Sequence, residues 1–137
     1  MNRLSKIPLS VELTRLYELS KRHLVELIFF DDELKFLKLL LEQYFQADLD
    51  DTYLNKVSMI KGKLAEISLI RNNINTDALQ HQGDLEAYFK AKVVHNSYFY
   101  EMESDRISQE IHDIEHQFRK VKSEIFLLFK TAIEKRP

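Results

Sequence analysis

The chain contains no cysteine among its 137 residues. Without thiols it cannot form a disulfide, a cysteine-based zinc site or a thiolate nucleophile, and this composition fits a reducing compartment. Residues 1–8 carry no apolar run of the length that a secretory signal needs. No stretch reaches the roughly 18 apolar residues of a membrane-spanning helix. We therefore expect a cytoplasmic protein with no membrane partner.

Glycine and proline are also scarce, with two residues of each. A sheet protein needs these residues for its turns, and a phosphate-binding loop or an oxyanion hole needs glycine. Helix-forming Leu, Glu, Lys and Ile are abundant instead. With 45% hydrophobic and 31% charged residues, the chain is sized for one domain with its own core, covering 1–137. The composition predicts an all-α fold and argues against an enzyme.

Neither the acidic nor the basic residues are clustered in one part of the sequence. The formal net charge is −2, and basic residues alternate with acidic ones along the chain. A nucleic-acid-binding protein usually carries its lysines and arginines in a stripe or patch. We therefore expect no nucleic-acid partner.

Apolar residues recur at alternating steps of four and three in three long segments, which is the pattern of a heptad seam. The segments predict helices at about 9–46, about 50–82 and about 97–134. Their similar lengths favour an up-down-up three-helix bundle with coiled-coil-like seams. Each helix would bury one apolar edge against the other two.

The boundary between the second and third helices is the least regular part of the pattern. We expect Gly83 to cap the second helix, because glycine commonly ends helices. Residues 84–95 are then predicted to form a short helical connector. Asn96 or Ser97 is a suitable N-cap for the third helix. A third helix that began at Asp84 would overhang the first by more than ten residues.

Two histidines form the one local pattern with a catalytic precedent. His112 and His116 flank Glu115 in the order H-x-x-E-H, which one class of zinc peptidases uses. That class needs a further acidic ligand downstream and a much larger fold. The inward positions Ile111 and Ile114 also turn both histidines toward solvent, so we interpret the pair as part of a solvated face.

A buried di-iron centre needs Glu-x-x-His motifs on facing helices, and none of the five histidines has a glutamate three residues before it. The sequence therefore predicts no metal, no cofactor and no catalytic residue.

Polar residues interrupt the inward positions and predict a polar layer in the core. The first two helices contribute Ser20, His23 and Arg71, and the third contributes Ser104. The hairpin of the first two helices places Arg71 level with Glu26, so we expect an ion pair. Such a layer fixes the register of a bundle. The alternative interpretation is a small binding cleft around His23 and Arg71.

A second apolar stripe lies on the first helix, on the side away from its seam. It consists of Val25, Ile28, Phe29, Phe36 and Leu39, with Asp32 among them. Leaving such side chains in water forfeits about 1.5–3 kcal/mol each, so we expect the stripe to be covered. One possible cover is intramolecular, by Leu85, Phe89 and Val93 of the connector and Tyr98, Phe99 and Met102 of the third helix. The other is a homodimer or a partner protein's helix.

The run Glu26–Leu37, together with His116–Lys120 leading into Glu124–Phe129, resembles small uncharacterised all-helical bacterial proteins. The resemblance implies a helical bundle and assigns no functional residue. Our first hypothesis is a non-enzymatic bundle that acts by self-association or partner-helix docking. The alternative is a bundle that binds a metal or small ligand through His23 and Arg71 or through His112 and His116. The sequence does not separate the first hypothesis from a chaperone or sensor with an openable core.

Overall fold

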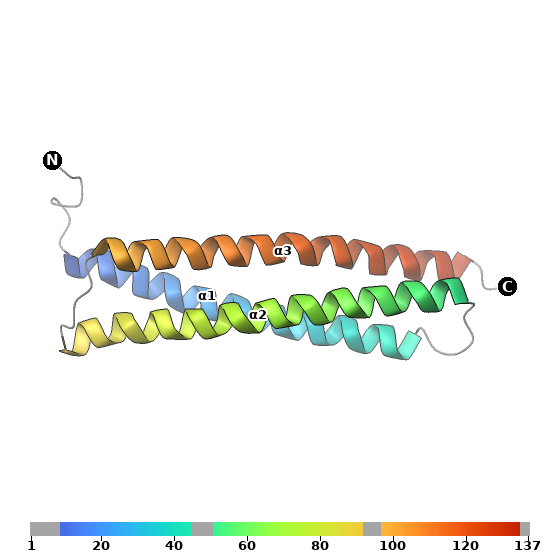
Figure 1. Cartoon of the computed structure of the whole chain (residues 1–137), viewed down its shortest axis with the longest axis horizontal. Helices are drawn as coiled ribbons and strands as arrows, with labels where there is room; N and C mark the ends of the chain where they lie inside the picture. Colours follow the sequence, from blue (N-terminus) through green and yellow to red (C-terminus); the bar gives the residue numbers. More distant parts are fainter. Residues whose placement is uncertain (1–8, 45–50, 92–96, 135–137) are drawn as a thin grey trace. The chain divides into compact units, whose positions relative to one another are not determined.

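The structure is a computed structural model that describes residues 9–44, 51–91 and 97–134, and all of these are helical. Figure 1 shows the three helices, α1 (Leu9–Tyr44), α2 (Asp51–Ala91) and α3 (Ser97–Glu134). These three ranges contain no strand, and in them α2 runs antiparallel to α1 and α3. The fold is an all-α three-helix bundle, as the heptad pattern predicted.

Helix α2 does not end at Gly83, so the prediction of a cap there and of a separate connector is wrong. The helix continues to Ala91, while residues 92–95 lie outside the described ranges. Its inward pattern runs on through His81 and Leu85, which are both buried. A Cβ added at Gly83 would meet nothing within 4 Å, so this glycine lies on the open side of the helix. A glycine there costs roughly 1 kcal/mol, which the burial of Leu85 offsets.

The other helix bounds lie close to the expected ones. Helix α3 spans Ser97–Glu134, the range that the third heptad segment indicated. Helix α1 begins at Leu9 and is described to Tyr44, and the expected last residues, 45 and 46, lie outside the described ranges. None of the described helices is long and apolar enough to cross a membrane.

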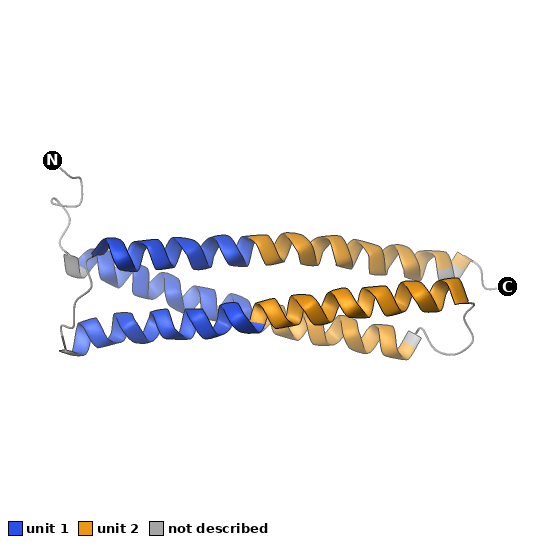
Figure 2. Ribbon diagram, in the orientation of Figure 1, with its two compact units in different colours: residues 1–28, 72–112 blue, residues 29–71, 113–137 orange. Residues whose placement is uncertain are grey.

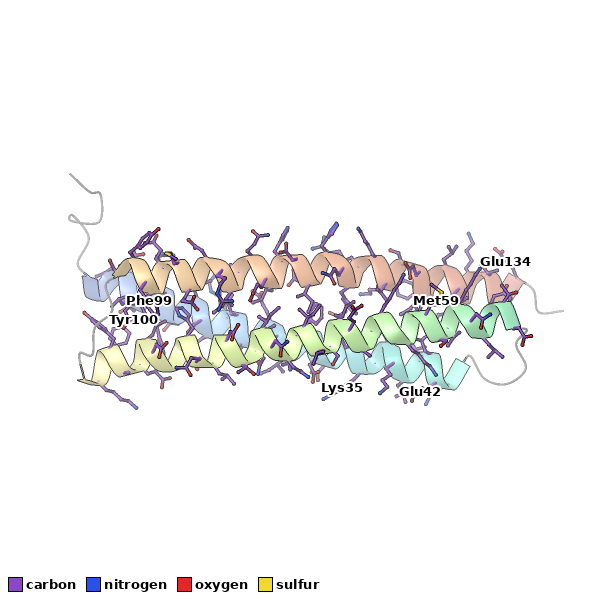
Figure 3. The ribbon with its side chains drawn as sticks, in the orientation of Figure 1. Lys35, Glu42, Met59, Phe99, Tyr100 and Glu134 are labelled. Atoms are coloured by element: carbon purple, nitrogen blue, oxygen red, sulfur yellow. The ribbon has the colours of Figure 1, made fainter. Side chains whose placement is uncertain are left out.

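The chain divides into two compact units, which Figure 2 shows in different colours. Among the described residues, the first unit combines 9–28 with 72–91 and 97–112. Its core contains Leu13 and Leu16 of α1, Leu85 of α2 and Tyr100 of α3, each at most 1% exposed. Figure 3 labels Tyr100 at this core. Tyr17 adds an interhelical hydrogen bond, because its hydroxyl donates to Glu86 Oε1 at 3.0 Å.

The second unit combines the described residues 29–44, 51–71 and 113–134. The rings of Phe30 and Phe118 pack against each other with centroids 4.8 Å apart. Around them, all three helices contribute buried aliphatic side chains at heptad spacing. These include Leu34, Leu37, Leu41, Val57, Ile60, Leu64, Val121, Ile125 and Leu128. Burial of each such side chain contributes about 1.5–3 kcal/mol, so this apolar core is the main source of stability in the unit.

Candidate functional site

The apolar stripe predicted on α1 is exposed in the structure. We call Val25, Ile28, Phe29, Phe36 and Leu39 the α1 stripe. Phe29 is 64% and Phe36 61% exposed, and the other three are at least half exposed. One or two positions from stripe residues, and therefore on another face of the helix, Leu27, Phe30 and Leu37 are buried in the core. Helix α1 therefore has one apolar face inside the bundle and a second apolar face in water.

The side chains that we expected to cover the α1 stripe lie elsewhere. Leu85 is part of the first unit's core with Leu13 and Leu16, near the beginning of α1. The ring of Phe89 packs edge-on against Tyr17, with centroids 6.0 Å apart. At the start of α3 the side chains of Tyr98, Phe99 and Met102 are themselves exposed. The predicted intramolecular cover is therefore wrong for these residues, and Val93 lies outside the described ranges.

Charged side chains flank the α1 stripe in the second unit. Lys35 Nζ forms an ion pair with Asp31 Oδ2 at 2.8 Å, one turn earlier on the helix. In Figure 3 the labelled Lys35 and Glu42 lie along the same edge of α1. An apolar centre with a charged rim is the usual arrangement of a helix that pairs with another helix.

Three residues predicted for the polar layer, Ser20, His23 and Ser104, are buried in the first unit, and together with His81 and Ser108 we call them the His-Ser cluster. All but the half-buried Ser108 are at most 4% exposed. The Ser108 hydroxyl lies 2.9 Å from His23 Nε2, within hydrogen-bond distance. Ser20 Oγ donates to the Tyr17 carbonyl at 2.6 Å. His23 of α1 thus lies beside Ser108 of α3, and it is near enough to His81 of α2 to lower the pKa of that histidine.

Several polar atoms of this cluster have no hydrogen-bond partner among the described residues. They are His23 Nδ1, both ring nitrogens of His81 and Ser104 Oγ. An uncompensated buried polar group typically costs about 1–3 kcal/mol. The cluster therefore lowers the stability of the first unit relative to an apolar layer of the same shape.

Burial lowers the pKa of both histidines from their ordinary value of 6.5. For His23 the neighbouring Arg22 lowers the pKa further. For His81 the loss of hydration is the largest effect, while the carboxylates of Glu103 and Asp84 partly oppose it. Both imidazoles are therefore neutral near pH 7, and a proton on either ring would be a buried charge.

Two members of the predicted layer, Glu26 and Arg71, belong to different units. Glu26 is exposed in the first unit, and Arg71 is partly exposed in the second. The ion pair between them and the cleft around His23 and Arg71 stay predictions. The prediction missed His81 as a member of the layer, although its inward heptad position was the available signal. Ser108 carries no such signal, because it follows the inward Ile107 directly.

A groove in the second unit, not anticipated from the sequence, lies between α2 and α3. It has a volume of about 370 Å³, and Ile60 and Leu128 are among the side chains that line it. Met59 and Leu127, both 64% exposed, form apolar rims. Lys63 Nζ contacts both carboxylate oxygens of Glu124, at 3.0 and 3.1 Å, and so links the two walls. Lys56 adds a second positive charge to the lining.

His112 and His116 are exposed on α3, while Ile111 and Ile114 are buried, which is the orientation that the heptad frame indicated. Within the described ranges there is no group of three or more histidine, aspartate or glutamate side chains arranged to hold a metal ion.

Comparison with known proteins places the chain in no family. No family model, curated protein or solved structure matches it.

Proposed function

We propose that the protein is a non-enzymatic helical bundle that acts in the cytoplasm by protein–protein association through the α1 stripe. The observation that supports this most directly is the exposure of Phe29 and Phe36, 64% and 61%, on a helix whose opposite face fills the core. Each large apolar side chain that becomes buried contributes about 1.5–3 kcal/mol. Contiguous exposed apolar residues with a polar rim are typical of interaction surfaces.

The expected mode of association is coiled-coil pairing, in which a second helix packs along α1. Val25 lies three residues from Ile28 and four from Phe29, Phe36 lies seven residues after Phe29, and Leu39 lies three after Phe36, so the stripe residues form one band on the helix surface. A facing helix with the same spacing can insert its side chains between them. The partner is a second copy of the chain or an amphipathic helix of another protein.

Site-specific photo-crosslinking tests this function. A benzoylphenylalanine introduced at Phe36 should give a defined covalent product in cells that express the chain. The matched control carries the same group at Phe126, an exposed phenylalanine on α3, and should give little product. Equal yields at the two positions would contradict the proposal. The mass of the product then identifies the partner, since a second copy adds 16.4 kDa.

A second candidate function is the binding of a small amphiphile in the groove of the second unit. The apolar rims Met59 and Leu127 favour an acyl or aromatic body, and Lys56 favours an anionic group. The volume of about 370 Å³ lies within the range of small-ligand sites, roughly 300–1,000 Å³. A fluorescent fatty acid should bind the parent chain. Leu127→Glu should weaken this binding at least tenfold, while Phe126→Glu leaves it unchanged. Equal effects of the two substitutions would exclude the groove.

A further inference from the structure

We propose that the α1 stripe binds a second copy of this chain, with the two α1 helices antiparallel and related by a two-fold axis that passes beside Asp32. This inference depends on the proposed function, because it names the partner and the geometry for the same surface. It follows from the order of exposed residues along α1.

Four of the five stripe residues are placed symmetrically about Asp32 along the helix. Val25 and Leu39 each lie seven residues from Asp32, and Ile28 and Phe36 each lie four residues away. In an antiparallel pair centred on Asp32, Val25 of one chain therefore lies level with Leu39 of the other along the helix axis, and Ile28 lies level with Phe36. Each layer then combines a smaller β-branched side chain with a larger one, which favours interdigitation.

The two phenylalanines distinguish an antiparallel pair from a parallel one. Phe29 and Phe36 are seven residues apart, almost two full turns, so they lie on the same flank of the stripe. A two-fold axis perpendicular to the helices brings each flank against its own copy. Phe29 of one chain then meets Phe36 of the other, twice in the dimer, and aromatic pairs add to the stability of an interface. A parallel pair would instead bring Phe29 against the opposite flank, which carries Ile28 and Lys35.

Charged residues on the other flank are also complementary in the antiparallel pair. Lys21 lies eleven residues before Asp32 and Glu42 ten residues after it. Lys21 of each chain therefore approaches Glu42 of the other. A parallel pair would place Lys21 level with its own copy and far from Glu42 along the helix axis. Lys21 is exposed; its ammonium group lies 3.4 Å from the exposed Glu18 carboxylate and 4.8 Å from the centre of the Tyr17 ring, so a partner can still reach it.

The one unfavourable contact of this geometry is at the axis, where the two Asp32 carboxylates meet. Asp32 is exposed in the single chain, so it is hydrated before association. Replacement by the uncharged isostere removes the repulsion. We expect Asp32→Asn to lower the dimer dissociation constant about threefold or more, the effect of one surface charge pair. An unchanged or weaker dimer would contradict the placement of Asp32 at the axis.

Disulfide cross-linking tests the geometry directly, because the natural sequence has no cysteine. In the antiparallel pair the two copies of residue 25 are about 21 Å apart along the axis, too far for a disulfide, whereas residue 25 lies opposite residue 39. Val25→Cys and Leu39→Cys should each link poorly alone and link efficiently when mixed. Asp32→Cys should link with itself. Lys61→Cys, at an exposed position of α2, is the negative control.

The outcomes separate this inference from the proposed function. If Val25→Cys links with itself and does not link with Leu39→Cys, the antiparallel arrangement is overturned while association through the stripe stands. If Asp32→Cys links no more than Lys61→Cys and the Phe36 photo-crosslink has the mass of another protein, the second copy is overturned as the partner. If the Phe36 position gives no specific product either, the proposed function fails as well.

Discussion

Mild acid should destabilise the first unit, because His23 and His81 are buried in their neutral form. Burial lowers both pKa values below 6.5, so the unfolded chain binds more protons than the folded chain between the folded pKa values and pH 6.5. Stability therefore rises with pH in this window, and it is lost as the pH falls below about 6.5. His81 should have the larger role, because neither of its ring nitrogens has a partner among the described residues.

The size of the effect follows from proton linkage. A histidine that is neutral in the folded state and protonated in the unfolded state contributes about 1.4 kcal/mol per pH unit. Between pH 6.5 and pH 5 the upper limit is therefore about 2 kcal/mol for each histidine and about 4 kcal/mol for both. The nearby Glu103 does not contribute in this window, because Arg106 holds its pKa below the ordinary 4.5.

Urea unfolding followed by circular dichroism, at one protein concentration and at several pH values from 7.5 to 5, measures the loss. Over this range His81→Leu should lose at most about half as much stability as the parent, because only His23 still contributes. At pH 7.5 it should be as stable as the parent or about 1 kcal/mol more stable, because two uncompensated polar atoms are removed. The control is His112→Gln on the exposed face of α3, which should keep the parent's pH dependence. If His81→Leu and the parent lose the same stability between pH 7.5 and 5, the conclusion that His81 is buried in its neutral form is refuted.

Two further substitutions test the fold. Gly83→Ala should raise the free energy of unfolding, measured in a urea titration, by about 0.5–1 kcal/mol. The added Cβ meets no neighbour, and alanine has the higher helix propensity. A decrease would show that α2 does not continue through this position. Lys63→Ala should lower the free energy of unfolding by no more than about 1 kcal/mol, because Lys63 and Glu124 are both 43% exposed and their ion pair is well hydrated. A loss above about 2 kcal/mol would show that the link between the groove walls is structurally essential.

The heptad pattern predicted the bundle and most helix bounds because it reports directly which side of a helix is buried. It located α1 and α3, and it placed Ser20 and His23 in the core. The prediction failed at Gly83, because this glycine was interpreted as the end of the helix although the pattern of inward-facing residues continues to Leu85. A single glycine costs too little to stop a helix that still gains burial beyond it.

The sites that depend on contacts between helices were harder to predict. His81 and His23 join one layer only because of the register between α2 and α1, which one-helix periodicity does not determine. The groove depends on which long side chains meet at the rim between α2 and α3. The α1 stripe was predicted in full, because its residues all belong to one helix, but its exposure required knowing where Leu85 and Phe89 pack.

The His-Ser cluster also bears on how the chain selects one structure. A heptad repeat allows several alignments of the helices. These alignments differ by shifts of seven residues and bury nearly the same apolar surface area. Only one alignment brings these imidazoles and hydroxyls into the same layer. In any other alignment each of them would be buried among apolar side chains alone. A variant with leucine at every position of this layer should therefore resist denaturant better and yet populate more than one alignment. It would be more stable but would no longer select a single structure.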